Sequence, residues 1–157
     1  GIKANDFTLH HSCGCEMVEY AAATNIIDLF LNDIPYIHAE KYNDDPRDLG
    51  NIRNFDDFYS RVEVMMRNMK RLIKKSNYED EIFKPIIMKV GSARKGPKGL
   101  HDMATEIELI GRKVGLTLHD KIFNELRPSM QSFITSTAFE KRFSLKLHET
   151  NLIFLDY

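Results

Sequence analysis

The chain has 157 residues, of which 43% are hydrophobic and 29% charged, and its formal net charge is −1 because 22 basic residues oppose 23 acidic ones. This composition excludes a disordered chain and gives no overall positive field for nucleic acid or an anionic membrane. A chain of this length can bury one hydrophobic core without disulfides, so we expect a single domain.

The sequence shows no signal for a membrane anchor or for secretion. No apolar run approaches the ~18 residues of a membrane-spanning helix, and the N-terminus lacks a signal-peptide pattern. The two cysteines are separated by one residue, which gives no disulfide framework. We therefore expect a cytoplasmic or otherwise intracellular protein. Because the chain starts at Gly1 and stops just after the apolar run Leu152–Leu155, we also expect it to be part of a larger protein.

The first third of the chain predicts a strand, a helix and a loop. Aromatic and β-branched residues favour a short strand over Phe7–His11. Apolar residues at three- and four-residue steps predict a helix from Glu16 that Pro35 ends. Turn-forming and charged residues over His38–Arg53 indicate a surface loop.

The clearest predicted helix follows Asn54. Asn54 is a favourable N-cap, and Asp56 and Asp57 complement the positive helix start. Basic residues in the last turns complement the negative end. Six apolar residues share one stripe of this helix: Phe55, Phe58, Val62, Met65, Met69 and Leu72.

Apolar spacing predicts four further helices, followed by two short strands in the tail. The helices are expected from Lys84 to Val90, from Leu100 to Gly115, from Leu118 to Pro128 and from Pro128 to Phe139, and the strands over Phe143–Leu147 and Leu152–Leu155. The predicted fold class is therefore mainly α: one helical domain of about six helices over residues 1–157, with a small β element that pairs the N-terminal segment with the C-terminal hairpin.

One cluster concentrates soft-metal and redox chemistry: His10, His11, Cys13 and Cys15. Thiolates and imidazoles are the ligands that zinc prefers, so these residues are a candidate zinc site, with a further ligand from a distant histidine or a carboxylate. Cys15 also precedes a predicted helix, where the dipole favours a thiolate. The Cys-x-Cys spacing is tighter than that of known structural zinc sites, so the cluster is also compatible with a plain turn between a strand and a helix.

A basic, glycine-rich loop over Lys89–Gly99 is the second candidate site. Arg94, Lys95 and Lys98 lie just before a predicted helix, where basic side chains and backbone N–H groups suit a phosphate or nucleic acid. The spacing matches neither a P-loop nor a dinucleotide fingerprint. The alternative is a surface loop kept soluble by its lysines.

A third constellation lies at the start of the following predicted helix. His101, Thr105 and Glu108 share one helical face, which could bind a metal or relay a proton. The same residue types also serve as helix caps and solvent-exposed charges.

No pattern associated with a particular reaction emerges from these motifs. We therefore expect a non-enzymatic binding or regulatory module that presents a helical surface to a protein partner, with no cofactor. Two alternatives stay open: a metal- or thiol-dependent protein centred on the His10–Cys15 cluster, and a protein that binds phosphate or nucleic acid through the Lys89–Gly99 loop.

Overall fold

The structure is a computed structural model that describes residues 25–35, 37, 44–91, 93–94, 100–125 and 148–157. Its centre is a four-stranded mixed sheet with the strand order β1-β2-β6-β5. These strands are β1 (Phe30–Asp33), β2 (Ile86–Val90), β5 (Thr117–Glu125) and β6 (His148–Leu155). β1 and β2 are parallel, whereas β6 is antiparallel to both β2 and β5. A separate two-stranded ladder joins β3 (Ala93–Arg94) to β4 (Leu100–His101).

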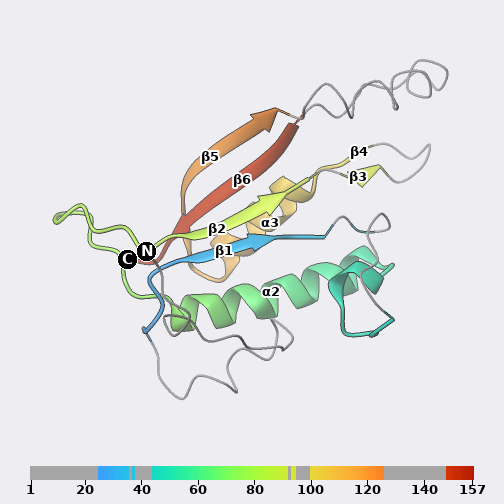
Figure 1. Cartoon of the computed structure of the whole chain (residues 1–157), viewed down its shortest axis with the longest axis horizontal. Coiled ribbons are helices and arrows are strands. Elements are labelled where there is room, and N and C mark those ends of the chain that lie inside the picture. Colours follow the sequence, from blue (N-terminus) through green and yellow to red (C-terminus); the bar gives the residue numbers. More distant parts are fainter. Residues whose placement is uncertain (1–24, 36, 38–43, 92, 95–99, 126–147) are drawn as a thin grey trace, which may run out of the picture.

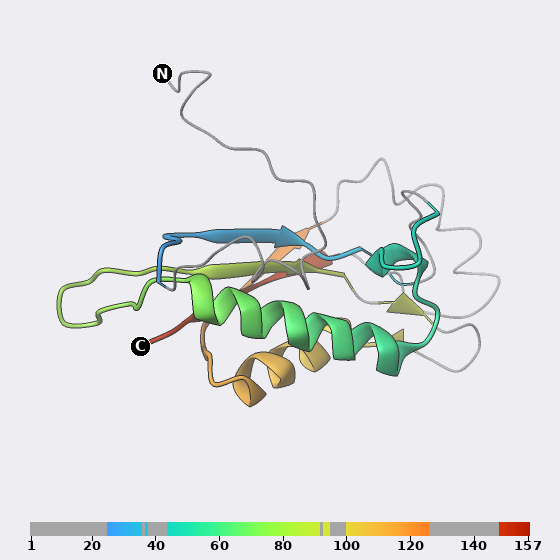
Figure 2. The same cartoon turned by 90° about the horizontal axis from the view of Figure 1, so that it is seen from below.

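Two α-helices cover one face of the sheet (Figures 1 and 2). Helix α2 (Phe55–Leu72) connects β1 to β2, and α3 (Met103–Lys113) precedes β5. A short 3-10 helix, η2 (Leu49–Asn51), lies in the connection before α2. In the described part of the chain, the helices and the sheet therefore form an α/β arrangement of two layers that contains a β1-α2-β2 unit.

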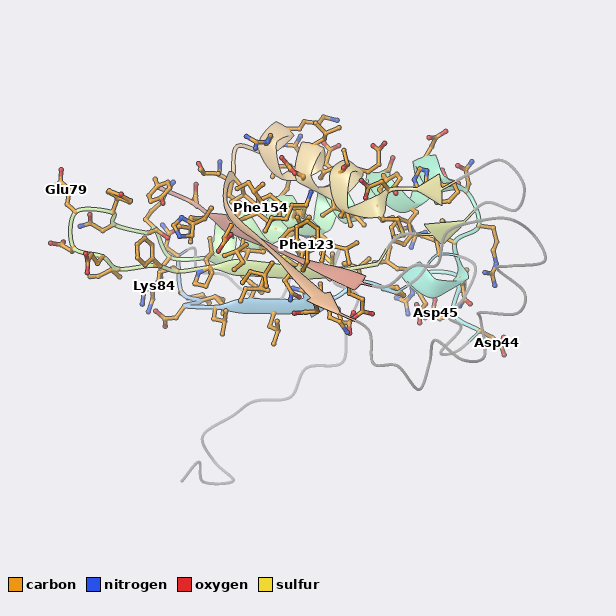
Figure 3. The ribbon with its side chains drawn as sticks, turned by 90° about the horizontal axis from the view of Figure 1, so that it is seen from above. Asp44, Asp45, Glu79, Lys84, Phe123 and Phe154 are labelled. Atoms are coloured by element: carbon orange, nitrogen blue, oxygen red, sulfur yellow. The ribbon has the colours of Figure 1, made fainter. Side chains whose placement is uncertain are left out.

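The core fills the space between the two helices and the sheet. Fully buried side chains come from α2, α3, β2 and β6: Phe58, Val62, Met66, Met69, Met103, Ile107, Ile86, Met88, Leu152 and Phe154. Gly111 lets α3 approach the sheet, because a Cβ at this position would lie 2.3 Å from the ring of Phe154. Figure 3 shows Phe154 beneath α3.

The sequence correctly predicts both helices that the structure describes. Asn54 caps α2 by accepting a hydrogen bond from the N–H of Asp56 at 2.8 Å, and Asp102 caps α3. The C-terminal segment Leu152–Leu155 is also a strand, as predicted, and it lies in the centre of the sheet between β2 and β5. The other strand of the predicted hairpin and the N-terminal segment expected to pair with it lie outside the described residues.

The mainly α fold class is wrong, because three segments predicted as helices contain strands instead. β1 lies within Glu16–Pro35 and β2 within Lys84–Val90, and β5 overlaps most of Leu118–Pro128. In β1 the side chains alternate between faces, so Leu31 is exposed although it lies on the predicted helical stripe. In β2 the residues alternate between buried and half-buried with a period of two. Short apolar runs fit both periods, and pairing with neighbouring strands decides in favour of strands here: β1 pairs with β2, and both β2 and β5 pair with β6.

The remaining predicted elements are not tested. The strand over Phe7–His11, the helix over Pro128–Phe139 and the strand over Phe143–Leu147 lie outside the described residues. That the chain is part of a larger protein also stays a prediction. Within the part of the chain that the structure describes, no helix is long and apolar enough to cross a membrane.

Candidate functional site

The carboxyl ends of β1 and β2 lie at the same end of the sheet because the two strands are parallel. In open α/β sheets, ligands bind outside the carboxyl ends of such strands. Asp33 is the last residue of β1, and the chain continues from it into Ile34 and Pro35. Ile34 is buried, and its N–H donates a hydrogen bond to the carbonyl of Lys89 at 3.0 Å. This bond anchors the backbone directly after Asp33.

Asp33 belongs to a cluster of three charged side chains on adjacent strands. Nζ of Lys89 on β2 lies 2.8 Å from Oδ2 of Asp33 and 3.2 Å from Oε2 of Glu149 on β6. The exposed fraction falls across the cluster, from 64% for Asp33 to 34% for Lys89 and 15% for Glu149. The hydrogen bond to Asp33, helped by Glu149, raises the pKa of Lys89, so the lysine is an ammonium ion at neutral pH.

The cluster lies on the face of the sheet opposite to the helices. Asn32, the residue before Asp33, points toward α2, where its amide Nδ2 lies 3.7 Å from Sδ of Met69. Neighbouring residues of a strand point to opposite faces, so Asp33 points away from α2. Among the described residues, Oδ1 of Asp33 accepts no hydrogen bond. This oxygen is therefore open to accept one from a bound molecule.

A second group at this end of the molecule joins α2 to the β3–β4 ladder. The hydroxyl oxygen of Tyr59 lies 2.6 Å from Nε2 of His101, and the ring of Phe55 packs on His101 with centroids 3.9 Å apart. Burial raises the pKa of Tyr59, with smaller effects from Glu106 and Asp102, so the phenol keeps its proton. This contact joins β4 to the first half of α2. Figure 1 shows β4 and the start of α2 at the same end of the molecule.

The structure separates the His101, Thr105 and Glu108 constellation. His101 contacts Tyr59, and the hydroxyl of Thr105 donates to the N-cap carboxylate of Asp102 at 2.7 Å. Glu108 instead accepts from Arg112 at 3.0 Å and lies 3.4 Å from Lys121. His101 therefore packs on α2, whereas Thr105 and Glu108 take part in contacts that stabilise α3, and the three side chains form no metal site among the described residues.

The other residues predicted from the sequence are not tested. The His10, His11, Cys13 and Cys15 cluster lies outside the described residues, so zinc binding there stays a prediction. No three His, Cys, Asp or Glu side chains gather to hold a metal within the described ranges. Lys95 and Lys98 also lie outside them, and for Arg94 only the backbone is described, in β3 at the carboxyl end of β2.

A hollow of about 500 Å³ lies at the opposite end of the sheet. Its lining is mainly basic: Asn25, Arg67, Lys70, Arg71, Lys75, Val114 and Asp156. The carboxylate of Asp156 is almost fully buried there, and Nζ of Lys75 lies 2.9 Å from its Oδ2. This carboxylate is therefore already neutralised by the chain itself.

Sequence reasoning misses Asp33, Lys89 and Glu149 as a group. Asp33 falls inside a predicted helix and Lys89 at the end of another, so neither segment is expected to pair with the other. The available signal is the order of residues around position 33, where apolar residues lead into Asn32 and Asp33 and a proline follows at position 35. Polar residues directly after a short apolar run are typical of a strand that ends at a ligand site.

Comparison with known proteins identifies the fold. No protein-family model and no curated protein matches the chain. A Thermus thermophilus protein assigned as a DNA modification methylase has the same fold, with a TM-score of 0.62 and 13% identity over 90% of this chain and 50% of that chain. The complex of the same protein with S-adenosyl-L-methionine matches with a TM-score of 0.59 and 17% identity, over 91% of this chain and 53% of that chain.

A second solved structure supports the same comparison. The cytosine-N4-specific PvuII DNA methyltransferase matches with a TM-score of 0.66 and 14% identity, over 92% of this chain and 47% of that chain. The chain thus spans about half the length of the solved structures that it matches. At these identities the comparison establishes the shared α/β fold, which is the fold found in DNA methyltransferases.

Proposed function

We propose that this chain is the catalytic half of an enzyme that transfers a methyl group from S-adenosylmethionine to an exocyclic amino group of a DNA base. The observation that carries this proposal is the open carboxylate oxygen of Asp33 at the carboxyl end of β1, in a fold shared with DNA methyltransferases. The same comparison overturns the expectation of a non-enzymatic helical module with a protein partner, and favours nucleic acid as the partner.

The residues at this end of the sheet suit S-adenosylmethionine, which supplies an electrophilic methyl group on a sulfonium cation when bound. Asp33 is an exposed carboxylate, and one of its oxygens accepts no hydrogen bond among the described residues. A cation is favoured beside such a group. We expect Asp33 to lie beside the sulfonium of S-adenosylmethionine and the amino group of the target base. The remaining contacts would come from residues equivalent to the half of the longer solved structures that this chain does not cover.

Asp33 would activate the amino group of the base. The lone pair of an amine on an aromatic ring is delocalised into the ring, so the nitrogen is a weak nucleophile. A carboxylate that accepts a hydrogen bond from this N–H returns electron density to the nitrogen and fixes its direction. Attack by the nitrogen would break the bond between the methyl carbon and the sulfonium sulfur, whose electron pair stays on sulfur as a neutral thioether, and the methylated nitrogen would then carry a positive charge and lose one proton. Oδ1 of Asp33 would accept that proton.

The basic loop between β3 and β4 would contact the DNA backbone. An enzyme that modifies a base must take it out of the stack, which requires firm contacts to the flanking phosphates. Binding of phosphate by Arg94, Lys95 and Lys98 stays a prediction, and it fits this function because β3 and β4 lie at the same end of the sheet as Asp33. The Tyr59–His101 contact would hold the base of the loop in place.

Substitution of Asp33 tests the proposal in the native protein that carries this sequence. The assay measures transfer of a labelled methyl group from S-adenosylmethionine to DNA. We expect Asp33→Ala to lower kcat by at least about 100-fold, because it removes the acceptor. Asp33→Asn should lose less than Asp33→Ala, because its amide oxygen still accepts a hydrogen bond from the amine.

Asp57→Ala is the matched control. Asp57 is an exposed aspartate in the first turn of α2, so its loss should leave kcat within about twofold of the native value. Full activity of Asp33→Ala, with wild-type folding, would show that Asp33 does not act on the amine. Absence of any methyl transfer to DNA by the native protein would refute the function itself.

A further inference from the structure

We propose that Lys89 is a positioning residue for Asp33: it binds Oδ2 of Asp33 and thereby turns Oδ1 toward the target amine, while Glu149 holds Lys89 from the other side. This inference rests on the proposed function. It assigns a role in that reaction to a lysine that does not itself touch the reacting atoms.

The position of Lys89 in the sheet supports this role. Lys89 is the register partner of Asp33 in the parallel β1–β2 pair, so the two Cα atoms are direct neighbours across the strands. β2 lies between β1 and β6 and is hydrogen-bonded to both. The backbone of Lys89 is therefore fixed from two sides, whereas Asp33 lies at the end of a strand that is four residues long.

Asp33 needs such support because it is the most exposed member of the cluster. An aspartate side chain that is 64% exposed and has no partner would sample several rotamers. The 2.8 Å contact between Nζ of Lys89 and Oδ2 fixes one of the two oxygens. The other oxygen is then held in a single direction, which a productive hydrogen bond to a substrate requires.

Glu149 on β6 holds Lys89 from the side opposite to Asp33. The ammonium ion lies between the two carboxylates, 3.2 Å from the glutamate and 2.8 Å from the aspartate. Glu149 is the less exposed of the two acids and offers Lys89 an interaction that solvent screens less. Lys89 thus divides its contacts between the two acids, and Asp33 shares the lysine with Glu149.

The alternative is that the cluster only stabilises the sheet. Partly exposed ion pairs between strands contribute little to stability, and many contribute nothing measurable. A purely structural lysine would lower activity only through folding, and its effect would not depend on whether Asp33 is charged. The two roles therefore predict different outcomes in combined variants.

The test compares Lys89→Met and Lys89→Arg in the native protein and in an Asp33→Asn background. We expect Lys89→Met to lower kcat for methyl transfer about 10-fold with little change in KM for DNA, because orientation and not binding is lost. Lys89→Arg should recover most of kcat, because a guanidinium can still donate to both acids. In the Asp33→Asn background, Lys89→Met should cause no further loss, because the amide has no charge to pair with the lysine.

Lys84→Met is the matched control. Nζ of Lys84 lies 2.7 Å from Oδ1 of Asp28, a comparable Lys–Asp pair at the amino end of the sheet. In Figure 3, Lys84 lies toward the end of the molecule marked by Glu79, away from Asp45. Lys84→Met should keep the native kcat. Thermal unfolding checks that each variant is folded, and Lys89→Gln replaces Lys89→Met if the latter is not.

The outcomes separate the inference from the proposed function. If the native protein transfers methyl groups to DNA and Lys89→Met has native kcat, the positioning role is refuted and the function stands. Equal fold-losses from Lys89→Met in the native and Asp33→Asn backgrounds would refute it as well, because the lysine would then act independently of the aspartate. No methyl transfer by the native protein would remove both.

Discussion

Asp33 and Asp156 lie at opposite ends of the same sheet, and both pair with lysine, but their surroundings differ. Asp156 is 5% exposed, and Nζ of Lys75 lies 2.9 Å and Nζ of Lys70 3.6 Å from its two oxygens. The same lysines donate to main-chain carbonyls of Tyr157, Val114 and Gly115. Asp33 is 64% exposed and shares its one lysine with a second acid.

This difference separates a structural carboxylate from one that is available for chemistry. At Asp156 the charges balance within the protein, and both oxygens are used to join the end of β6 to the end of α2. At Asp33, Lys89 binds Oδ2. Among the described residues nothing donates to Oδ1, so this oxygen is open to a ligand. An ion pair alone does not mark a functional site, whereas an ion pair with a spare acceptor at the carboxyl end of a parallel strand is a good candidate.

Alanine substitution of each of the two aspartates should give the largest effects, on activity at Asp33 and on stability at Asp156. Asp33→Ala should reduce kcat by the ~100-fold given above and leave the free energy of unfolding within about 0.5 kcal/mol. Asp156→Ala should lower the free energy of unfolding by about 2 kcal/mol, because it removes a buried partner of two lysines, with native kcat in the folded fraction. Urea denaturation and the methyl-transfer assay measure the two quantities. A large loss of stability in Asp33→Ala would invalidate the comparison.

A third aspartate, Asp102, lies at the same end of the sheet as the Tyr59–His101 contact. Unlike the carboxylate of Asp33, that of Asp102 caps a helix, because it accepts hydrogen bonds from Thr105 at the start of α3. Burial raises the pKa of Asp102, yet hydrogen bonds from Thr105 outweigh it, and the pKa lies below the ordinary 3.8. Asp102→Ala should cost about 1 kcal/mol of stability. Because the folded pKa is lowered, this contribution is present above pH 3.8 and is lost as the pH falls further. Denaturation curves at pH 7 and at acid pH measure it, and a difference that persists at strongly acid pH would count against the cap.

The smallest expected effect concerns the stability supplied by Lys89. Because Lys89 is about one-third exposed, its ion pairs should contribute no more than about 1 kcal/mol after screening by solvent. Its pKa is raised above 10.5 in the folded state, so the contribution is full below pH 10.5 and is lost as the pH rises through the folded value. Unfolding of Lys89→Met and the native protein at neutral and alkaline pH measures this. A difference that grows with pH would show that the ion pairs are not its source.

The sequence predicts the described helices well because each has local signals. Asn54, Asp102 and the apolar stripes lie within or directly before the helices that they specify. The strands depend on partners far away in the chain, such as β2 on β6, and a run of five residues carries too few positions to separate a period of two from one of 3.6. That is why the sequence pattern predicts helices where the short strands β1 and β2 lie.

The candidate site is not predictable from the sequence for the same reason. Asp33, Lys89 and Glu149 are far apart in the sequence, and only the sheet brings them together. A lone aspartate followed by Ile34 and Pro35 reads equally well as the polar end of a helix that a proline terminates. Residues that are close together in the sequence, such as those from His10 to Cys15, are more easily predicted as a site. That cluster lies outside the described residues and stays a prediction.

The central claim is that Asp33 accepts a hydrogen bond from an amino group during methyl transfer. The most direct measurement is nucleoside analysis of DNA after reaction of the native protein with labelled S-adenosylmethionine, with Asp33→Ala in parallel. We predict label on an exocyclic nitrogen, and its loss in the variant. Label on a ring carbon would contradict this role of Asp33, because a carbon has no N–H that could donate a hydrogen bond to the carboxylate. No label at all would contradict it as well.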